Sequence, residues 1–143
     1  MLVKDVMTAS PVFCRPADTL DRVARLMVEH DCGVIPICEL RKPIGIITDR
    51  DITCRAVAAG KAPGAVRVND VMTKNVFTVE DDDVQTAIDL MEKKQVRRLP
   101  VLNGEGNLVG IVAPSDLAPT FASTNVSDFL LAVSYWTRKP VGV

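Results

Sequence analysis

The stretch "GIITDRDI", residues 45–52, returns further along the chain as "GIVAPSDL", residues 110–117. The glycine, the first isoleucine and the last aspartate recur at the same spacing, but Thr48 of the first phrase is Ala113 in the second. Other pieces repeat in the same order, since "VKDVMT" at 3–8 returns as "VNDVMT" at 68–73. Two copies are too few, and the period too long, for a solenoid. We therefore expect two similar half-domains packed about a pseudo-two-fold axis.

The repeat also predicts how the chain is divided. We expect a first unit at 1–60, a linker at 61–67, a second unit at 68–119 and a C-terminal helix and tail at 120–143. In the tail, Val126, Phe129, Leu130 and Val133 recur at the spacing of one helix face. Tyr135 and Trp136 follow this face, and we expect them to complete the core or to contact a second copy of the chain.

Each copy reads as strand, helix, strand, strand, helix. The segments "TLDRVARLMVEH" at 19–30 and "DVQTAIDLMEKK" at 83–94 carry apolar residues at i, i+3, i+4 and i+7, which predicts amphipathic helices. Short apolar runs follow, the second pair joined by an expected Asn-Gly turn. A further helix is expected in "DRDITCRAVAAG", ending at Gly60. The predicted fold class is α/β (α+β), with two β-α-β-β-α units.

Composition narrows the class of partner. The chain has 143 residues, of which 48% are hydrophobic, enough for one compact core. A net charge of −1 and an aromatic content of 4% make nucleic acid an unlikely partner. No apolar run approaches the roughly 18 residues of a membrane span, and the first residues lack the apolar core of a signal peptide. We expect a soluble cytoplasmic protein that does not interact with membranes.

The four cysteines, Cys14, Cys32, Cys38 and Cys54, include no C-x-x-C pair. In the cytoplasm thiols are favoured over structural disulfides. With His30, the single histidine, their spacing matches no known zinc motif. We interpret them as small buried hydrophobic residues and expect no metal site.

The duplicated "DVMT", the "IPI" and "LPV" strands and the "GIITDRDI" phrase together resemble the CBS-domain pair, or Bateman module. The resemblance covers roughly residues 2 to 118. It implies an adenosine-type regulatory ligand (AMP, ADP, ATP, NAD or S-adenosylmethionine) held in a cleft between the two units. It also implies a homodimer. The downstream protein partner is unknown.

The family's ligand motif, Gly-x-x-Thr/Ser-x-x-Asp, matches Gly45, Thr48 and Asp51. The resemblance assigns the ribose hydroxyls to Asp51 and the ribose–phosphate side to Thr48. Gly45 has no side chain and would let a flat base approach the strand. An alternative stays open, because Thr-x-x-Asp is also close to a helix capping box. In the second copy Asp116 remains but Ala113 has no hydroxyl, so we expect a weaker second site.

A phosphate needs cations, and the resemblance implies that basic residues before the "LPV" strand of one unit reach the phosphate held by the other. Those residues are Arg97 and Arg98, although two arginines after a helix can also be simply solvated. Arg50 and Arg55 are weaker substitutes. The expected walls of an apolar adenine slot, which would also suit a core, are Val12, Phe13, Ile35 and Pro36, with Pro11.

The sequence therefore predicts a nucleotide-sensing regulatory module. One alternative is a protein-interaction module that keeps the fold and the dimer without a tight ligand. Another is a thiol-based redox sensor. No nucleophile–base pair, metal constellation or Walker-type loop is visible, so an enzyme is not expected.

Overall fold

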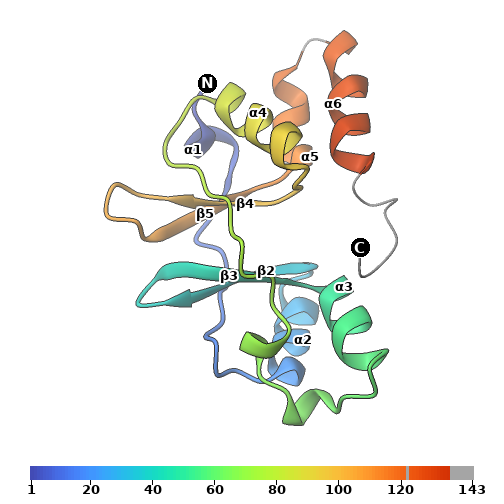
Figure 1. The fold of residues 1–143 in the computed structure, drawn as a ribbon. Coiled ribbons are helices and arrows are strands. Elements are labelled where there is room, and N and C mark those ends of the chain that lie inside the picture. The colour runs from blue at the N-terminus through green and yellow to red at the C-terminus, as the bar shows by residue number, and fades with distance from the viewer. Residues whose placement is uncertain (122, 136–143) are drawn as a thin grey trace. The chain divides into compact units, whose positions relative to one another are not determined.

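The computed structural model describes residues 1–121 and 123–135, and the chain divides into two compact units (Figure 1). The middle unit is Pro11–Val76, and the terminal unit joins Met1–Ser10 to Phe77–Val143. These units are defined by contacts in space, whereas the expected boundaries at 60 and 68 follow sequence repetition, so those boundaries remain a prediction. Trp136 and the side chain of Tyr135 lie outside the described part of the chain.

The middle unit is a helix packed on a hairpin. Helix α2 (Leu20–Glu29) lies on the same side of the hairpin β2 (Val34–Glu39) and β3 (Lys42–Thr48) as α3 (Asp49–Asp51) (Figure 1). A π-helical turn, η1 (Ile52–Val57), continues α3, so the expected helix is only partly α-helical. Two short 3₁₀ turns, η2 (Pro63–Ala65) and η3 (Val68–Asp70), complete the unit.

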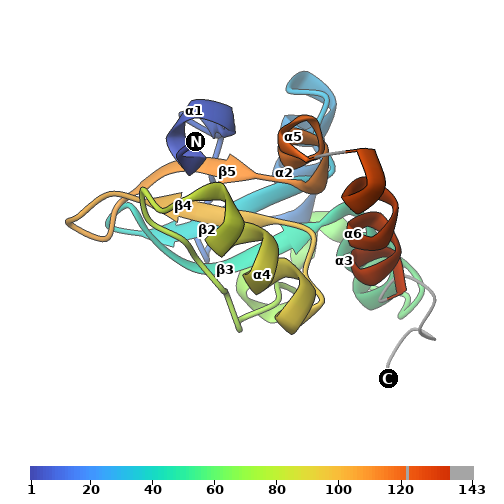
Figure 2. The same cartoon turned by 90° about the horizontal axis from the view of Figure 1, so that it is seen from above.

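The terminal unit has more helix around a three-stranded sheet of order β1-β5-β4. Figure 1 shows its helices on one side of the β4–β5 hairpin, and Figure 2 views that side from above. Its elements are α1 (Val3–Val6), β1 (Thr8–Ala9), α4 (Val84–Lys94), β4 (Leu99–Leu102), β5 (Leu108–Val112), α5 (Pro114–Leu117), η4 (Ala118–Thr120) and α6 (Ser123–Tyr135). None of the helices in the described ranges combines the length and apolar character needed to span a membrane.

The start of each sequence copy belongs to the unit that contains the hairpin of the other copy. In the terminal unit, β1 from the first "VMT" pairs antiparallel with β5, placing Thr8 opposite Ile111. In the middle unit, Thr73 from the second "VMT" exchanges two backbone hydrogen bonds of 2.9 Å with Ile46. The two "VMT" segments therefore occupy equivalent places, each beside the strand of the other copy.

The predicted amphipathic helices are confirmed by burial. In α4, Val84, Ala87, Ile88 and Met91 are all buried, and in α2 the buried residues are Leu20, Val23 and Met27. The Asp83 carboxylate accepts a 2.9 Å hydrogen bond from the Gln85 N–H and caps α4, while Lys93 and Lys94 lie in its last turn. Charges at both ends therefore complement the helix dipole. In α6, Phe129 and Val133 are buried, whereas Leu130 is 40% exposed.

The hairpin turns differ from the expectation. The loop after β4 is a five-residue loop in which Asn103 Oδ1 accepts from the N–H groups of Glu105 and Asn107, and Gly106 has positive φ. The tight two-residue turn is in the other hairpin, where Leu40 and Arg41 both adopt positive φ. The predicted Asn-Gly turn is therefore wrong, because the Asn103 side chain organises a longer loop instead.

The first strand expected in each copy is present only as an isolated β-bridge. Cys14 makes a single parallel bridge to Ile37, and Val79 makes one to Val101. Backbone hydrogen bonds hold Cys14 in place, since its N–H donates to Pro36 and its carbonyl accepts from Cys38. The mixed α+β class is confirmed, with shorter outer strands than the sequence suggested.

Candidate functional site

The best-organised polar group in the middle unit lies where β3 ends and α3 begins. Thr48 Oγ1 accepts a 3.0 Å hydrogen bond from the Asp51 N–H, and Asp51 Oδ2 accepts one of 3.0 Å from the Thr48 N–H. This is a reciprocal capping box, so the capping alternative is present in the structure. The Asp51 side chain is only 14% exposed. Its two oxygens carry more acceptor capacity than this one hydrogen bond uses.

The second copy keeps half of the same arrangement. Asp116 Oδ2 accepts a 2.8 Å hydrogen bond from the Ala113 N–H. Ala113 has no side-chain acceptor, and the Asp116 N–H instead bonds the Ala113 carbonyl at 3.0 Å. Pro114 occupies the first helical position, where a missing N–H has no cost. The junction after β5 therefore offers a carboxylate but no hydroxyl.

Gly45 lies under a methionine. A Cβ placed on Gly45 would come 2.5 Å from Met72 Sδ, so the thioether already covers the position we expected a base to approach. The terminal unit repeats the arrangement, with Met7 Sδ packed against the position that a Cβ on Gly110 would take. Both methionines come from "VMT" segments. This packing is not among the expectations from the sequence, although the repeated Met and Gly, read together, indicate it.

Of the four residues expected to line the adenine, two are buried in the core and two are at least partly exposed. Ile35 and Pro36 are buried in β2, Ile35 completely, whereas Val12 is half-buried and Phe13 is 42% exposed. All four belong to the middle unit, like Thr48 and Asp51. Of the four, Phe13 and Val12 have the surface to contact a ligand in this conformation.

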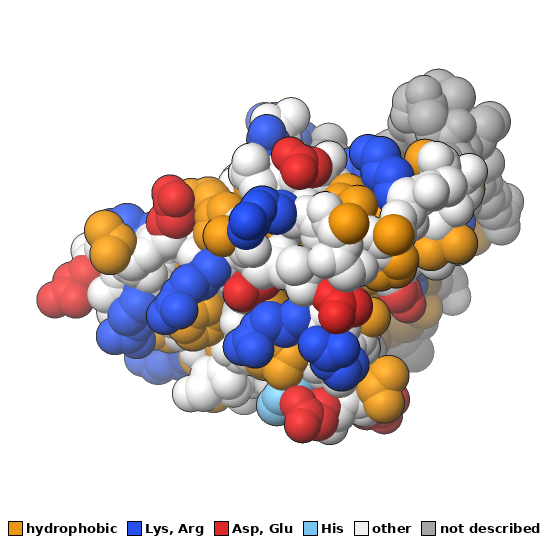
Figure 3. Space-filling view, turned by 90° about the horizontal axis from the view of Figure 1, so that it is seen from below, with side chains coloured by type: hydrophobic (Ala, Val, Ile, Leu, Met, Phe, Trp, Pro, Cys, Tyr) orange, Lys and Arg blue, Asp and Glu red, His pale blue; other side chains and the backbone are white. Residues whose placement is uncertain are grey.

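Arg97 and Arg98 belong to the terminal unit, in the segment between α4 and β4. Arg98 Nη1 donates a 2.8 Å hydrogen bond to the Arg97 carbonyl, and Arg97 is exposed. Because Thr48 and Asp51 belong to the middle unit, the pairing of these arginines with that site stays a prediction. Figure 3 shows one face of the molecule, on which lysine and arginine side chains alternate with acidic ones.

Arg55 is the basic residue next to Asp51 within the middle unit. Its Nε lies 3.8 Å from Asp51 Oδ1, and its Nη1 donates a 3.1 Å hydrogen bond to the Val71 carbonyl. From the sequence, Arg97 and Arg98 are stronger candidates for the phosphate than Arg55. The i, i+4 spacing from Asp51 is the signal that could have raised it.

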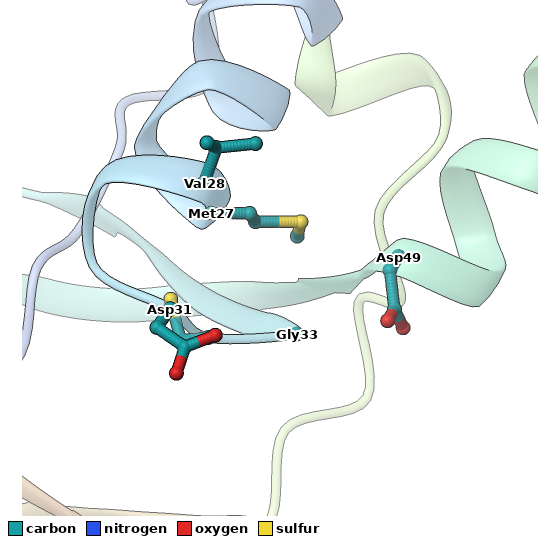
Figure 4. A pocket seen from close by; sticks show the side chains of 6 residues that line it. Met27, Val28, Asp31, Gly33 and Asp49 are labelled. Atoms are coloured by element: carbon teal, nitrogen blue, oxygen red, sulfur yellow. The ribbon is translucent and has the colours of Figure 1, made fainter.

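An open pocket of about 480 Å³ lies elsewhere in the middle unit, between the end of α2 and the start of α3 (Figure 4). Within its lining, the Asp49 N–H donates a 3.0 Å hydrogen bond to the Gly33 carbonyl, and a Cβ built on Gly33 would lie 2.9 Å from Asp49 Oδ2. Its lining is Met27, Val28, Asp31, Cys32, Gly33 and Asp49. Two carboxylates in this lining disfavour a phosphate there.

The four cysteines are free thiols. Burial raises the pKa of Cys14 and of Cys38 to about 11 each, so both are protonated at neutral pH. Cys32 and Cys54 are half-buried. Within the described residues, no group of three or more His, Cys, Asp and Glu side chains is arranged to hold a metal ion.

The CBS domain model matches residues 3–56 and 68–122, so this chain belongs to the CBS-domain family as a tandem pair. Among its relatives, Hypoxic response protein 1 of Mycobacterium tuberculosis is 33% identical over 132 residues, covering 91% of this chain and 92% of the relative. An uncharacterized protein of Methanopyrus kandleri is 41% identical over 116 residues. That match covers 80% of this chain but only 57% of the relative's length.

Solved structures agree with the fold. A crystal structure of Hypoxic Response Protein I with two coordinated zinc ions matches with a TM-score of 0.76 and 34% identity, covering 85% of this chain and 100% of that one. The CBS domain pair of protein MJ0100, in complex with 5′-methylthioadenosine and S-adenosyl-L-methionine, matches with a TM-score of 0.74 and 29% identity. It too covers 85% of this chain and 100% of that chain.

Proposed function

We propose that this chain is a regulatory module, not an enzyme, that binds an adenosine-containing ligand with Thr48 and Asp51 as its principal contacts. The observation that carries the proposal is the half-buried junction after β3, where Asp51 keeps acceptor capacity beside the Thr48 hydroxyl. The CBS pair of MJ0100 supports the ligand class, because it was crystallised with two adenosine compounds.

Each part of the ligand is matched by a different group of residues at the site. Two vicinal ribose hydroxyls are donors that match the oxygens of the Asp51 carboxylate. The Thr48 hydroxyl faces the sugar–phosphate side, and binding redirects it from the Asp51 N–H. Phe13 and Val12 supply apolar surface for the base. Arg97 and Arg98 of the terminal unit bind the phosphate, when the ligand has one.

The copies are unequal in this proposal. The junction after β5 has Asp116 but lacks the hydroxyl of Thr48, and it is flanked by Pro114. We infer a weaker second site there. One principal site per chain therefore responds to the ligand at lower concentration.

We also propose a homodimer. Leu130 and Leu131 of α6 are 40% and 62% exposed, so this helix presents large apolar side chains that a second copy of the chain would cover. Light scattering at micromolar concentration should give twice the 15.5 kDa chain mass, and a mass near 15.5 kDa at several salt strengths would contradict the dimer.

A specific observation favours a second candidate, a protein-interaction module without a tight ligand. The capping box closes Thr48 and Asp51 on each other, and Met72 covers Gly45. A site closed in this way can serve helix stability alone. The redox alternative has less support, because the raised pKa values of Cys14 and Cys38 keep both as unreactive thiols.

A thermal-shift panel separates these functions. The full chain is heated alone and with AMP, ADP, ATP, NAD, S-adenosylmethionine or adenosine, with guanosine monophosphate as the matched control. A ligand at about 100 times its Kd stabilises the folded state by about 2.7 kcal/mol, which moves the melting temperature by several degrees. No shift with any adenosine compound at millimolar concentration favours the interaction module.

A further inference from the structure

We propose that Arg55 is a positioning residue for the candidate nucleotide site: it holds the Asp51 carboxylate and ties it to the backbone of the second "VMT" segment, residues 71–73. This inference rests on the proposed function. It adds a residue that lies outside the Gly-x-x-Thr/Ser-x-x-Asp ligand motif.

The Arg55 guanidinium contacts the Asp51 carboxylate with one of its nitrogen atoms. Arg55 Nε lies 3.8 Å from Asp51 Oδ1, while the other carboxylate oxygen, Oδ2, accepts the Thr48 N–H at 3.0 Å. Asp51 thus has a partner at each oxygen, a backbone hydrogen bond at Oδ2 and an ion pair with the guanidinium at Oδ1. A carboxylate fixed in this way has less rotamer freedom to lose when a ribose binds.

The other end of the Arg55 side chain is anchored. Its Nη1 donates to the Val71 carbonyl at 3.1 Å and lies 3.5 Å from Thr73 Oγ1. Thr73 is itself paired with Ile46 of β3 by two backbone hydrogen bonds. The guanidinium therefore spans from the helix to a segment that is fixed against the strand.

The geometry of the turn explains why residue 55 reaches this segment. The chain is π-helical from Ile52 to Val57, and the Ala58 N–H bonds the Thr53 carbonyl five residues back. π-helical turns are rare and occur frequently at functional sites. Arg55 lies in the middle of this turn, four residues after Asp51, so both contacts start from one side chain.

The second copy has no equivalent. The residue four positions after Asp116 is Thr120, whose hydroxyl donates to the Leu117 carbonyl at 2.6 Å. A 3₁₀ turn containing Pro119 replaces the π-helical turn there. The two junctions therefore differ at a second pair of positions, Arg55 and Thr120, as well as at Thr48 and Ala113. In both pairs the first copy has the side chain that contacts its aspartate.

The test measures adenosine and AMP affinities by calorimetry in the full chain. Arg55→Ala should weaken both ligands by the same factor, roughly two- to fivefold, because an exposed ion pair acts here through the ribose-binding carboxylate. The matched control is Arg25→Ala on α2, which breaks another exposed i, i+4 arginine–aspartate pair, 3.2 Å between Arg25 Nη1 and Asp21 Oδ2, and should change neither affinity. Arg55→Lys should behave like Arg55→Ala, because one ammonium does not span Asp51 and Val71 as the planar guanidinium does.

A double variant isolates the mechanism. In an Asp51→Asn background, Arg55→Ala should cause no further loss, since Arg55 acts through Asp51. A larger loss for AMP than for adenosine, an additive loss in the double variant, or full recovery by lysine would each overturn the positioning role. The first of these results would make Arg55 a direct phosphate contact.

A readout without ligand keeps the two proposals distinguishable. The ¹³C chemical shift of the Asp51 carboxyl should move in Arg55→Ala and stay in place in Arg25→Ala. An unmoved signal in Arg55→Ala overturns the inference, whether or not a ligand binds. If the unaltered chain binds neither adenosine nor AMP, the proposed function fails, and the carboxyl signal still decides whether Arg55 holds Asp51.

Discussion

Thr48 and Asp51 each accept a hydrogen bond from the other's backbone N–H, both at 3.0 Å. The same two residues therefore stabilise the start of a helix and present the polar groups of the candidate site. A ligand that recruits them competes with the cap, so part of its binding free energy offsets the lost capping. Variants at this junction need a stability measurement beside every affinity measurement.

The two junctions should differ in affinity for an adenosine ligand. Asp51→Ala removes a charged acceptor from the ribose and should weaken binding by roughly 1.5–3 kcal/mol, or about 10- to 150-fold. Asp116→Ala should have a much smaller effect, because its junction lacks the hydroxyl of Thr48. Calorimetric titration of both variants, after each is shown to fold, is the measurement. Equal losses would mean two comparable sites.

Arg98→Ala should discriminate between ligands with and without a phosphate. Its proposed partner is the phosphate, so AMP should lose affinity by roughly tenfold while adenosine keeps its own. The comparison of adenosine with AMP in the same variant is an internal control for folding. If both ligands weaken equally, Arg98 does not contact the phosphate.

Ala113→Thr should complete the capping box of the second copy. The new hydroxyl can accept the Asp116 N–H, as Thr48 does for Asp51, while the Asp116 carboxylate already accepts the Ala113 N–H. We expect a gain of about 0.5–2 kcal/mol in the free energy of unfolding by urea titration. Thr48→Ala is the mirror experiment and should lose a similar amount. Destabilisation by Ala113→Thr would show that the half-buried site has no room for the side chain.

The β2–β3 turn should be improvable. Leu40 and Arg41 have φ of 50° and 67°, a conformation that costs about 1–2 kcal/mol for most L-residues, and Leu40 is 92% exposed. Replacing the pair with Asn-Gly, which favours this two-residue turn, should raise the free energy of unfolding by about 1 kcal/mol. Leu40→Ala is the control, since it removes the exposed side chain and leaves the backbone strain. An unchanged stability in the Asn-Gly variant would mean that the strain is relieved elsewhere.

The buried thiols should make the protein sensitive to alkali. Because the pKa of Cys14 and of Cys38 is raised from 9.0 to about 11 in the folded chain, the unfolded thiols ionise first as pH rises. Their contribution to stability is complete below about pH 9 and is lost between pH 9 and 11, on the order of 1–3 kcal/mol per thiol. Urea titrations at pH 8 and pH 10 should show a smaller loss for Cys38→Ala than for the unaltered chain.

The control for this titration is Cys54→Ala, at a half-buried cysteine. It should lose as much stability between pH 8 and 10 as the unaltered chain does. A pH dependence that is the same in Cys38→Ala and Cys54→Ala would show that other groups cause the alkaline loss.

The sequence by itself determined the repeat, the family and the amphipathic helices. Periodic apolar residues such as Val84, Ala87, Ile88 and Met91 must share one face of any helix, and all four are buried as predicted. The Thr-x-x-Asp spacing also fixed the capping box, because both hydrogen bonds join residues three positions apart. Local geometry decides such features, so the sequence suffices to predict them.

Only the tertiary structure decided the features that join distant residues. Met72 packs on Gly45, Arg55 reaches the Val71 carbonyl, and β1 pairs with the strand of the other copy. The turn types also escaped prediction, since the strained turn at Leu40 and Arg41 persists because the paired strands on either side hold it. These contacts depend on which segments the fold brings together, and the spacing of residues along one chain does not determine that.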